Sequence, residues 1–248
     1  ATGEKILQTQ VDWTKGLCVR GIFIPGNHDW QHWNKRGLDY IINQQQWIDS
    51  LRDKNIVFLP KNGCPGPVEV VINNNLVLAV LDTQWFLHQY DKPGGEGPCD
   101  AKTANDVFAL LADIFQRHYD KRIIVAGHHP IVTYGPHGGE FSWKDHVFPL
   151  RELNRHLYIP FPLVGSFYPM YRKLFGHIQD VSHPLYKEFS QPLEDLLKQY
   201  PGSIYVAGHE HALEYSVKDS THHIVSGSAA KTSHVKKKGF ARFAASKR

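Results

Sequence analysis

The sequence predicts a mixed α/β fold, and three observations support this prediction. The chain has 248 residues, of which 42% are apolar and 21% charged, so it can bury one large core. Three short apolar runs each end in glycine, which lets a buried strand turn sharply because glycine has no Cβ. Segments with apolar residues at helical spacing lie between these runs, as in chains that alternate strands and helices.

The first half of the chain is expected to contain two helices, a strand and a hairpin. Residues 4–16 are polar and compatible with a helix, and residues 44–53 predict a second helix. An apolar run within residues 19–25 predicts a strand between them. Residues 68–72 and 76–81 flank three consecutive asparagines, so they are expected to form a hairpin.

The second half is expected to alternate helices with strands. Residues 103–119 predict a helix, because five apolar side chains fall on one face: Val107, Leu110, Leu111, Ile114 and Phe115. A shorter helix is expected at residues 192–200, with its leucines facing the core. The expected strands of this half are residues 123–126, 204–207, 213–217 and 222–226.

Residues 141–190 differ in character from the rest of the chain. They are rich in aromatic residues and proline and have no clear periodicity. Long irregular segments in compact domains often act as lids or binding loops, so we predict a cap over the functional site. The alternative is that this segment only extends the core.

Histidine follows the glycine that ends each of three predicted strands. The carboxyl ends of strands meet at one edge of an open α/β sheet, so these histidines are expected to lie close together. Neutral imidazole and amide oxygen are ligands that suit Zn, Fe or Mn. The sequence therefore predicts a metal centre at three corners, which are residues 26–29 (Gly-Asn-His-Asp), 127–130 (Gly-His-His-Pro) and 208–211 (Gly-His-Glu-His).

These three corners resemble the motifs of the calcineurin-like metallophosphoesterase family, in the same order and after similar strands. Residues 81–83 and 127–138 are especially similar to the purple acid phosphatase branch of that family. The resemblance implies a four-layer α/β/β/α sandwich that spans residues 1–248 as a single domain, with residues 141–190 as a cap insertion. It also implies hydrolysis of phosphoric esters at a binuclear metal centre.

The resemblance assigns a metal ligand to each corner. Asn27, His128 and His209 would bind one ion, and His211 would bind the other. Fe, Zn and Mn all remain open as the metals. Two such ions would clamp a phosphate and lower the pKa of a bound water.

The remaining motif residues are expected to act on the substrate. His28 would be the general acid for the leaving group, and Asp29 would orient it through a hydrogen bond. His129, Tyr134 and His137 are expected to line the substrate pocket. A small phosphomonoester is the expected substrate, and the alternatives are a phosphodiesterase of the same family or a non-catalytic metal-binding or interaction module.

The chain departs from the family pattern ahead of the first corner. The family carries an Asp-x-His motif and a Gly-Asp motif there, which complete the first metal site and supply the bridging aspartate. Neither motif occurs before Gly26, where the only aspartate is Asp12. We therefore expect a domain that is partial at its N-terminus, binds metal weakly and hydrolyses little by itself.

The three cysteines form no Cys-x-x-Cys pair, which excludes the usual thiolate zinc and redox motifs. Cys64 and Cys99 lie in two loops rich in glycine and proline that the predicted hairpin would bring together. They are expected either to form a disulfide, as in an exported protein, or to be free thiols, as in a cytosolic one. Export is slightly favoured, and Cys18 is expected to be a core thiol.

The net charge of +4 comes largely from basic residues near the C-terminus, at positions 236–238 and 247–248. A short run of this kind is usually a solvated tail, so no nucleic-acid partner is expected. No stretch approaches the roughly 18 apolar residues needed to cross a bilayer. Residues 1–5 also lack the apolar run of a signal peptide.

Overall fold

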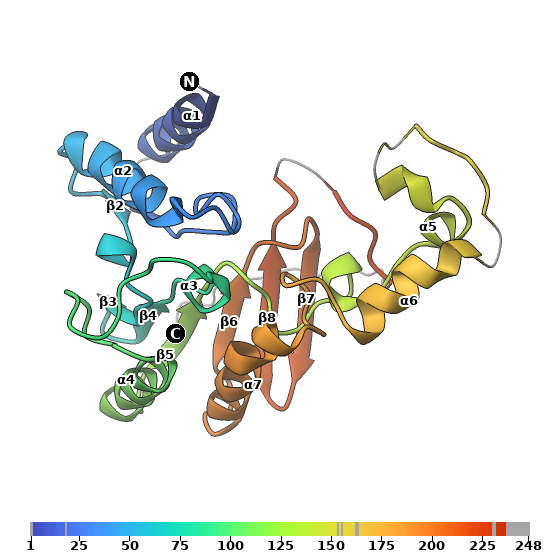
Figure 1. Ribbon diagram of the computed structural model, residues 1–248. Coiled ribbons are helices and arrows are strands. Elements are labelled where there is room, and N and C mark those ends of the chain that lie inside the picture. The colour runs from blue at the N-terminus through green and yellow to red at the C-terminus, as the bar shows by residue number, and fades with distance from the viewer. Residues whose placement is uncertain are drawn as a thin grey trace. The chain divides into compact units, whose positions relative to one another are not determined.

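The computed structural model describes residues 2–17, 19–152, 154, 156–161, 164–229 and 232–236 (Figure 1). It confirms the mixed α/β class, with parallel and antiparallel strands and helices along the chain. The chain forms two compact units, Ala1–His128 and His129–Arg248. No described helix is long and apolar enough to cross a membrane. The expectations for Cys18 and for the basic residues from 237 onward lie outside the described residues.

Unit 1 contains a pair of short parallel strands and a three-stranded sheet. The pair is β1 (Gly21–Phe23) with β2 (Ile56–Phe58). In the sheet, β3 (Val68–Asn73) and β4 (Leu76–Val80) form the predicted hairpin, and β4 pairs in parallel with β5 (Arg122–Ala126). The sequence did not predict β2, because its three apolar residues give too short a pattern without their partner β1.

The helices of unit 1 follow the predicted pattern with shifted ends. The predicted helix over residues 103–119 is confirmed, because Thr103 caps its first turn together with Asp106 and four of the five predicted apolar side chains are buried. The helix expected at residues 44–53 begins earlier and buries Ile41 and Ile48. The helices are α1 (Thr2–Gly16), α2 (Gly37–Ser50), α3 (Gln84–Leu87) and α4 (Ala104–Arg117), with a 3₁₀ turn η1 (Lys61–Gly63).

A disulfide joins Cys64 to Cys99, which confirms the first of the two alternatives for these cysteines. Their Cα atoms are 5.5 Å apart, within the range that a disulfide allows. The bond links the loop before β3 to the loop before α4, across a sequence separation of 35 residues. It therefore joins two loops of unit 1 that are distant in the sequence.

Unit 2 is built on three strands that the sequence predicted. β6 (Ile204–Ala207) pairs in parallel with β8 (Thr221–Ser226), and β8 pairs antiparallel with β7 (Leu213–Lys218). The long helix α7 (Pro184–Lys198) is tied to this sheet by an ion pair between Glu194 and Lys218. The sheet and α7 together form the core of the unit.

The helix α7 begins eight residues before the start expected at Pro192. Pro184 occupies its first turn, where a missing N–H costs nothing, and the His183 side chain accepts a hydrogen bond from the Leu185 N–H. Pro192 lies inside the helix, although proline there removes a hydrogen bond. Burial of the apolar face offsets this cost, with Tyr186 and Phe189 added to the predicted leucines.

The segment 141–190 contains short helices, although the sequence showed no periodicity there. These are α5 (Trp143–Val147), α6 (Phe167–Leu174) and the 3₁₀ turns η3 (Pro149–Glu152) and η4 (Val164–Ser166), preceded by η2 (Pro136–Gly138). The last residues of the segment belong to α7 and are part of the core. In Figure 1, α5 and α6 stand apart from the three strands of unit 2. Their role as a cap stays a prediction.

One buried histidine predicts how stability depends on pH. His223 on β8 is 3% exposed, and burial lowers its pKa to about 4 from the usual 6.5. Between pH 4 and 6.5 the unfolded chain therefore binds more protons at this histidine than the folded chain does. The contribution of neutral His223 to the free energy of unfolding is complete above about pH 6.5 and is lost as the pH falls towards 4. We expect His223→Gln to remove up to about 3 kcal/mol of this acid destabilisation, measured by urea unfolding at pH 4.5 and 7.5.

Candidate metal centre

The first corner holds Asn27 against His128 within unit 1. Asn27 Oδ1 accepts a hydrogen bond from His128 Nε2 at 3.0 Å. Gly26 is needed for this approach, because a Cβ there would overlap the His128 ring. An amide oxygen only accepts, so in the neutral His128 ring Nε2 carries the proton and Nδ1 carries the lone pair.

His28 and Asp29 lie at the same corner with different exposures. His28 is exposed, and its ring centroid lies 4.4 Å from that of His32. The Asp29 carboxylate accepts from the Gly26 N–H at 2.8 Å, and burial raises the pKa of Asp29 despite that bond and the nearby His28. Among the described residues Asp29 makes no hydrogen bond to the His28 ring. Its carboxylate instead holds the backbone turn that begins at Gly26.

The carboxylate of Asp82 holds the residues that follow the first corner. It accepts from Trp30 Nε1 at 2.8 Å and from the N–H groups of Gln84 and Trp85. It is fully buried, and this burial raises its pKa to about 8. Asp82 therefore fixes the loop that follows the first corner.

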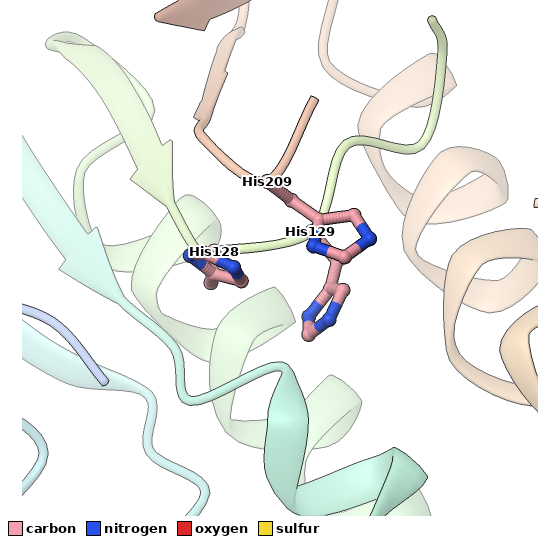
Figure 2. Close-up of side chains that lie close together, drawn as sticks. All are labelled: His128, His129 and His209. Atoms are coloured by element: carbon pink, nitrogen blue, oxygen red, sulfur yellow. The ribbon is translucent and has the colours of Figure 1, made fainter. Parts of the chain in front are cut away.

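The second and third corners bring histidine rings together. His129 and His209 are buried, and their ring centroids lie 4.5 Å apart. His128, which precedes His129 in the chain, completes a group of three histidines. One ligand atom of each lies within 4.8 Å of the others (Figure 2). His209 has φ of +59°, a left-handed conformation that is rare for residues other than glycine and concentrates at functional sites.

Gln179 orients both buried rings of unit 2. Its side-chain Oε1 accepts from His129 Nε2 at 2.7 Å, and its backbone carbonyl accepts from His209 Nε2 at 3.0 Å. A carbonyl oxygen only accepts, so in the neutral rings each Nε2 carries the proton and each Nδ1 carries the lone pair. The nitrogen suited to a metal is therefore Nδ1 in both residues.

Asp180 holds a third imidazole against His209. It accepts from His137 Nδ1 at 2.9 Å and from the Arg172 guanidinium. Burial alone would raise the pKa of Asp180, but the hydrogen bonds from His137 and Arg172 lower it below the usual value. The centroids of the His137 and His209 rings are 4.0 Å apart. His137, predicted to contact substrate, thus lies beside a predicted metal ligand.

The buried Glu210 and the half-buried Glu214 shape the loop between β5 and α5. Glu210 accepts from the N–H groups of His137 and His211, and Glu214 accepts from Thr133 Oγ1 and from the Tyr134 N–H. Gly135 packs directly on the Glu210 carboxylate, where any Cβ would overlap it. Both carboxylates therefore accept hydrogen bonds from backbone N–H groups, and neither is assigned as a metal ligand.

The histidine group differs in one member from the set that the resemblance implied. It contains His129, expected at the substrate pocket, while His211 is not part of it among the described residues. Sequence reasoning missed Gln179, Asp180 and Arg172 altogether. They lie in the segment without periodicity, and no motif there signals that they reach the histidines.

The chemistry of this group fits a borderline metal. Two nitrogens of a tetrahedral site are about 3.3–3.4 Å apart, so ligand atoms that lie within 4.8 Å of one another would have to move closer to bind one ion. The group offers imidazoles alone, while the acids of unit 2 that contact its surroundings, Asp180, Glu210 and Glu214, hold other groups. Imidazole suits Zn and Fe, whereas Mn favours carboxylates, so Zn and Fe both match this group better than Mn.

The role of Gln179 predicts a change that is confined to one histidine. In Gln179→Leu, His129 loses its acceptor and its Nε2–H tautomer should no longer dominate, while His209 keeps the backbone carbonyl at position 179 and its tautomer. Long-range ¹H–¹⁵N spectra of the histidine rings report both tautomers directly. Gln191→Leu, on the exposed side of α7, is the matched control and should leave both rings unchanged. Equal changes at His129 and His209 in Gln179→Leu would contradict the assignment.

No family model matches this chain, and no curated protein matches it in sequence.

Proposed function

We propose that this chain is a metal-dependent hydrolase of phosphoric esters that acts best on phosphomonoesters. The observation that supports it most is the group of His128, His129 and His209, which lies where two predicted strands end. The order of the three corners, and their likeness to metallophosphoesterase motifs, gives this group its proposed chemistry. A four-layer sandwich around two metal ions would be the framework.

Each residue at the corners has a proposed role. His128, His129 and His209 would hold one ion, with Asn27 next to them, and His211 would serve a second. When bound, such ions polarise a phosphate and lower the pKa of a bound water. The exposed His28 would donate a proton to the leaving oxygen, and His137, braced by Asp180, would contact the phosphate.

A second candidate is a metal-binding module without catalysis. It is favoured by one observation, which is that Asp180, Glu210 and Glu214 are all engaged by other groups. Without a carboxylate there is nothing in this set to bridge two ions or to offset their charge. The two candidates agree on metal binding and differ in hydrolysis.

The test begins with metal-stripped chain reloaded with Zn²⁺, Fe²⁺ or Mn²⁺. Hydrolysis of 4-nitrophenyl phosphate and of bis(4-nitrophenyl) phosphate is then measured beside the bound metal content. We expect slow metal-dependent hydrolysis, with the monoester faster than the diester. In His28→Asn the rate should fall further at unchanged metal content, most clearly for alkyl phosphates.

The outcomes separate the candidates. Stoichiometric metal without hydrolysis of either ester would favour the binding module. Loss of metal in His28→Asn would make His28 a ligand and overturn its role as an acid. Hydrolysis that persists after complete chelation would contradict the proposed function.

A further inference from the structure

The helix α6 in unit 2 presents an apolar stripe to solvent. Phe167, Met170, Tyr171 and Leu174 are each more than half exposed. Their spacing of three and four residues puts them on one face of the helix. A surface helix normally turns such a stripe towards the core, so this arrangement is unusual.

The opposite side of α6 is polar, and it is the side that unit 2 buries. Arg172 is only 12% exposed in its side chain and pairs with the buried Asp180. Pro169 is also buried. The polar anchor therefore fixes the orientation of the helix, and the apolar side has to face outward.

The elements packed against α6 also carry exposed apolar side chains. α5 and η4 pack against α6, and they carry Trp143 and Val164, which are 66% and 62% exposed. Phe175, just after α6, is exposed as well. We call these seven side chains the outer apolar patch: Trp143, Val164, Phe167, Met170, Tyr171, Leu174 and Phe175.

The charges beside the outer apolar patch are predominantly positive. The charged side chains of this region are those of α5 and α6 and the described side chains that form ion pairs with them. The acids in this set are Glu140, Asp145 and Asp180. Each is at most 23% exposed, and each is paired with a cation. The five cations are Lys144, Arg151, Arg172, Lys173 and Lys236. Lys173 and Lys236 are 55% and 60% exposed, so the accessible charge is cationic.

The exposed apolar side chains and the exposed cations together indicate which kind of partner fits the outer apolar patch. A second copy related by two-fold symmetry would bring the same cations together, and none of the described acids beside the patch is more than 23% exposed, which opposes self-association. An anionic lipid surface is complementary in both respects, because aromatic and aliphatic side chains enter the interface while lysines meet the headgroups. We propose that the outer apolar patch docks this chain on an anionic bilayer surface.

The test measures vesicle binding without metal or substrate, so its result does not depend on the proposed catalytic function. The intact chain is sedimented with vesicles of phosphatidylcholine alone and with vesicles containing 30% phosphatidylglycerol. We expect binding to the anionic vesicles only, weakened by 0.5 M NaCl. Phe167→Ser/Leu174→Ser should reduce the partition coefficient at least tenfold.

The control pair is Leu213→Ser/Val217→Ser, which removes two exposed apolar side chains from β7 in the same unit. It should bind vesicles as the unaltered chain does. Failure of the unaltered chain to bind anionic vesicles, or equal loss in the control pair, would overturn the proposal. Concentration-dependent dimers that Phe167→Ser/Leu174→Ser abolishes would also overturn it and would identify a second copy as the occupant.

Discussion

His209→Ala is expected to lower the Zn²⁺ affinity of the chain by at least about a hundredfold, since even outer hydrogen-bond partners of metal ligands are worth 10–100-fold. His209 belongs to the group with His128 and His129, and the Gln179 carbonyl holds its ring in one orientation. Its replacement removes a ligand and leaves too few imidazoles to hold the ion. Competition with a chromophoric chelator measures the affinity.

The matched control for this prediction is His222→Ala. His222 lies on β8, where its ring contacts the Tyr215 hydroxyl at 2.8 Å, and it takes no part in the histidine group among the described residues. Its replacement should leave the Zn²⁺ affinity within about twofold. An equal loss of affinity in both variants would show that the metal binds elsewhere on the chain.

Cys64→Ser/Cys99→Ser is expected to lower the free energy of unfolding by roughly 3–4 kcal/mol, from the chain entropy of a loop of this length. The separation of 35 residues sets that loop, and Cys99 is buried. Urea unfolding of the two proteins gives the difference. The unaltered chain in excess reductant should lose a similar amount, while a loss under about 1 kcal/mol would show that the loops hold their positions without the bond.

The parts of the fold that the sequence predicted are those with a local signal. The apolar runs before Gly26, Gly127 and Gly208 are indeed strands, and the helix expected over residues 103–119 forms as α4. The disulfide was one of two alternatives, because spacing alone does not decide redox state. Within the site, the contact of Asn27 with His128 was expected, but its reason was wrong: β1 pairs with β2 in a sheet of its own, and β5 lies in another sheet.

The parts that the sequence did not predict depend on contacts between distant residues. β2 exists because it pairs with β1, and the early start of α7 depends on burial of Tyr186 and Phe189. Gln179 contacts His129, which lies 50 residues away in the sequence, and no local sequence pattern indicates that these two residues meet. The outward apolar face of α6 was also hidden, because a hydrophobic period indicates a stripe but not which way it faces.

A crystal of the Zn²⁺-loaded chain, measured at the zinc absorption edge, locates the metal most directly. The account predicts an anomalous peak about 2.0–2.1 Å from Nδ1 of His129 and of His209. It predicts that Gln179 keeps its hydrogen bonds to both Nε2 atoms in that crystal. A peak at other residues, or no peak beside these rings at saturating Zn²⁺, would contradict it.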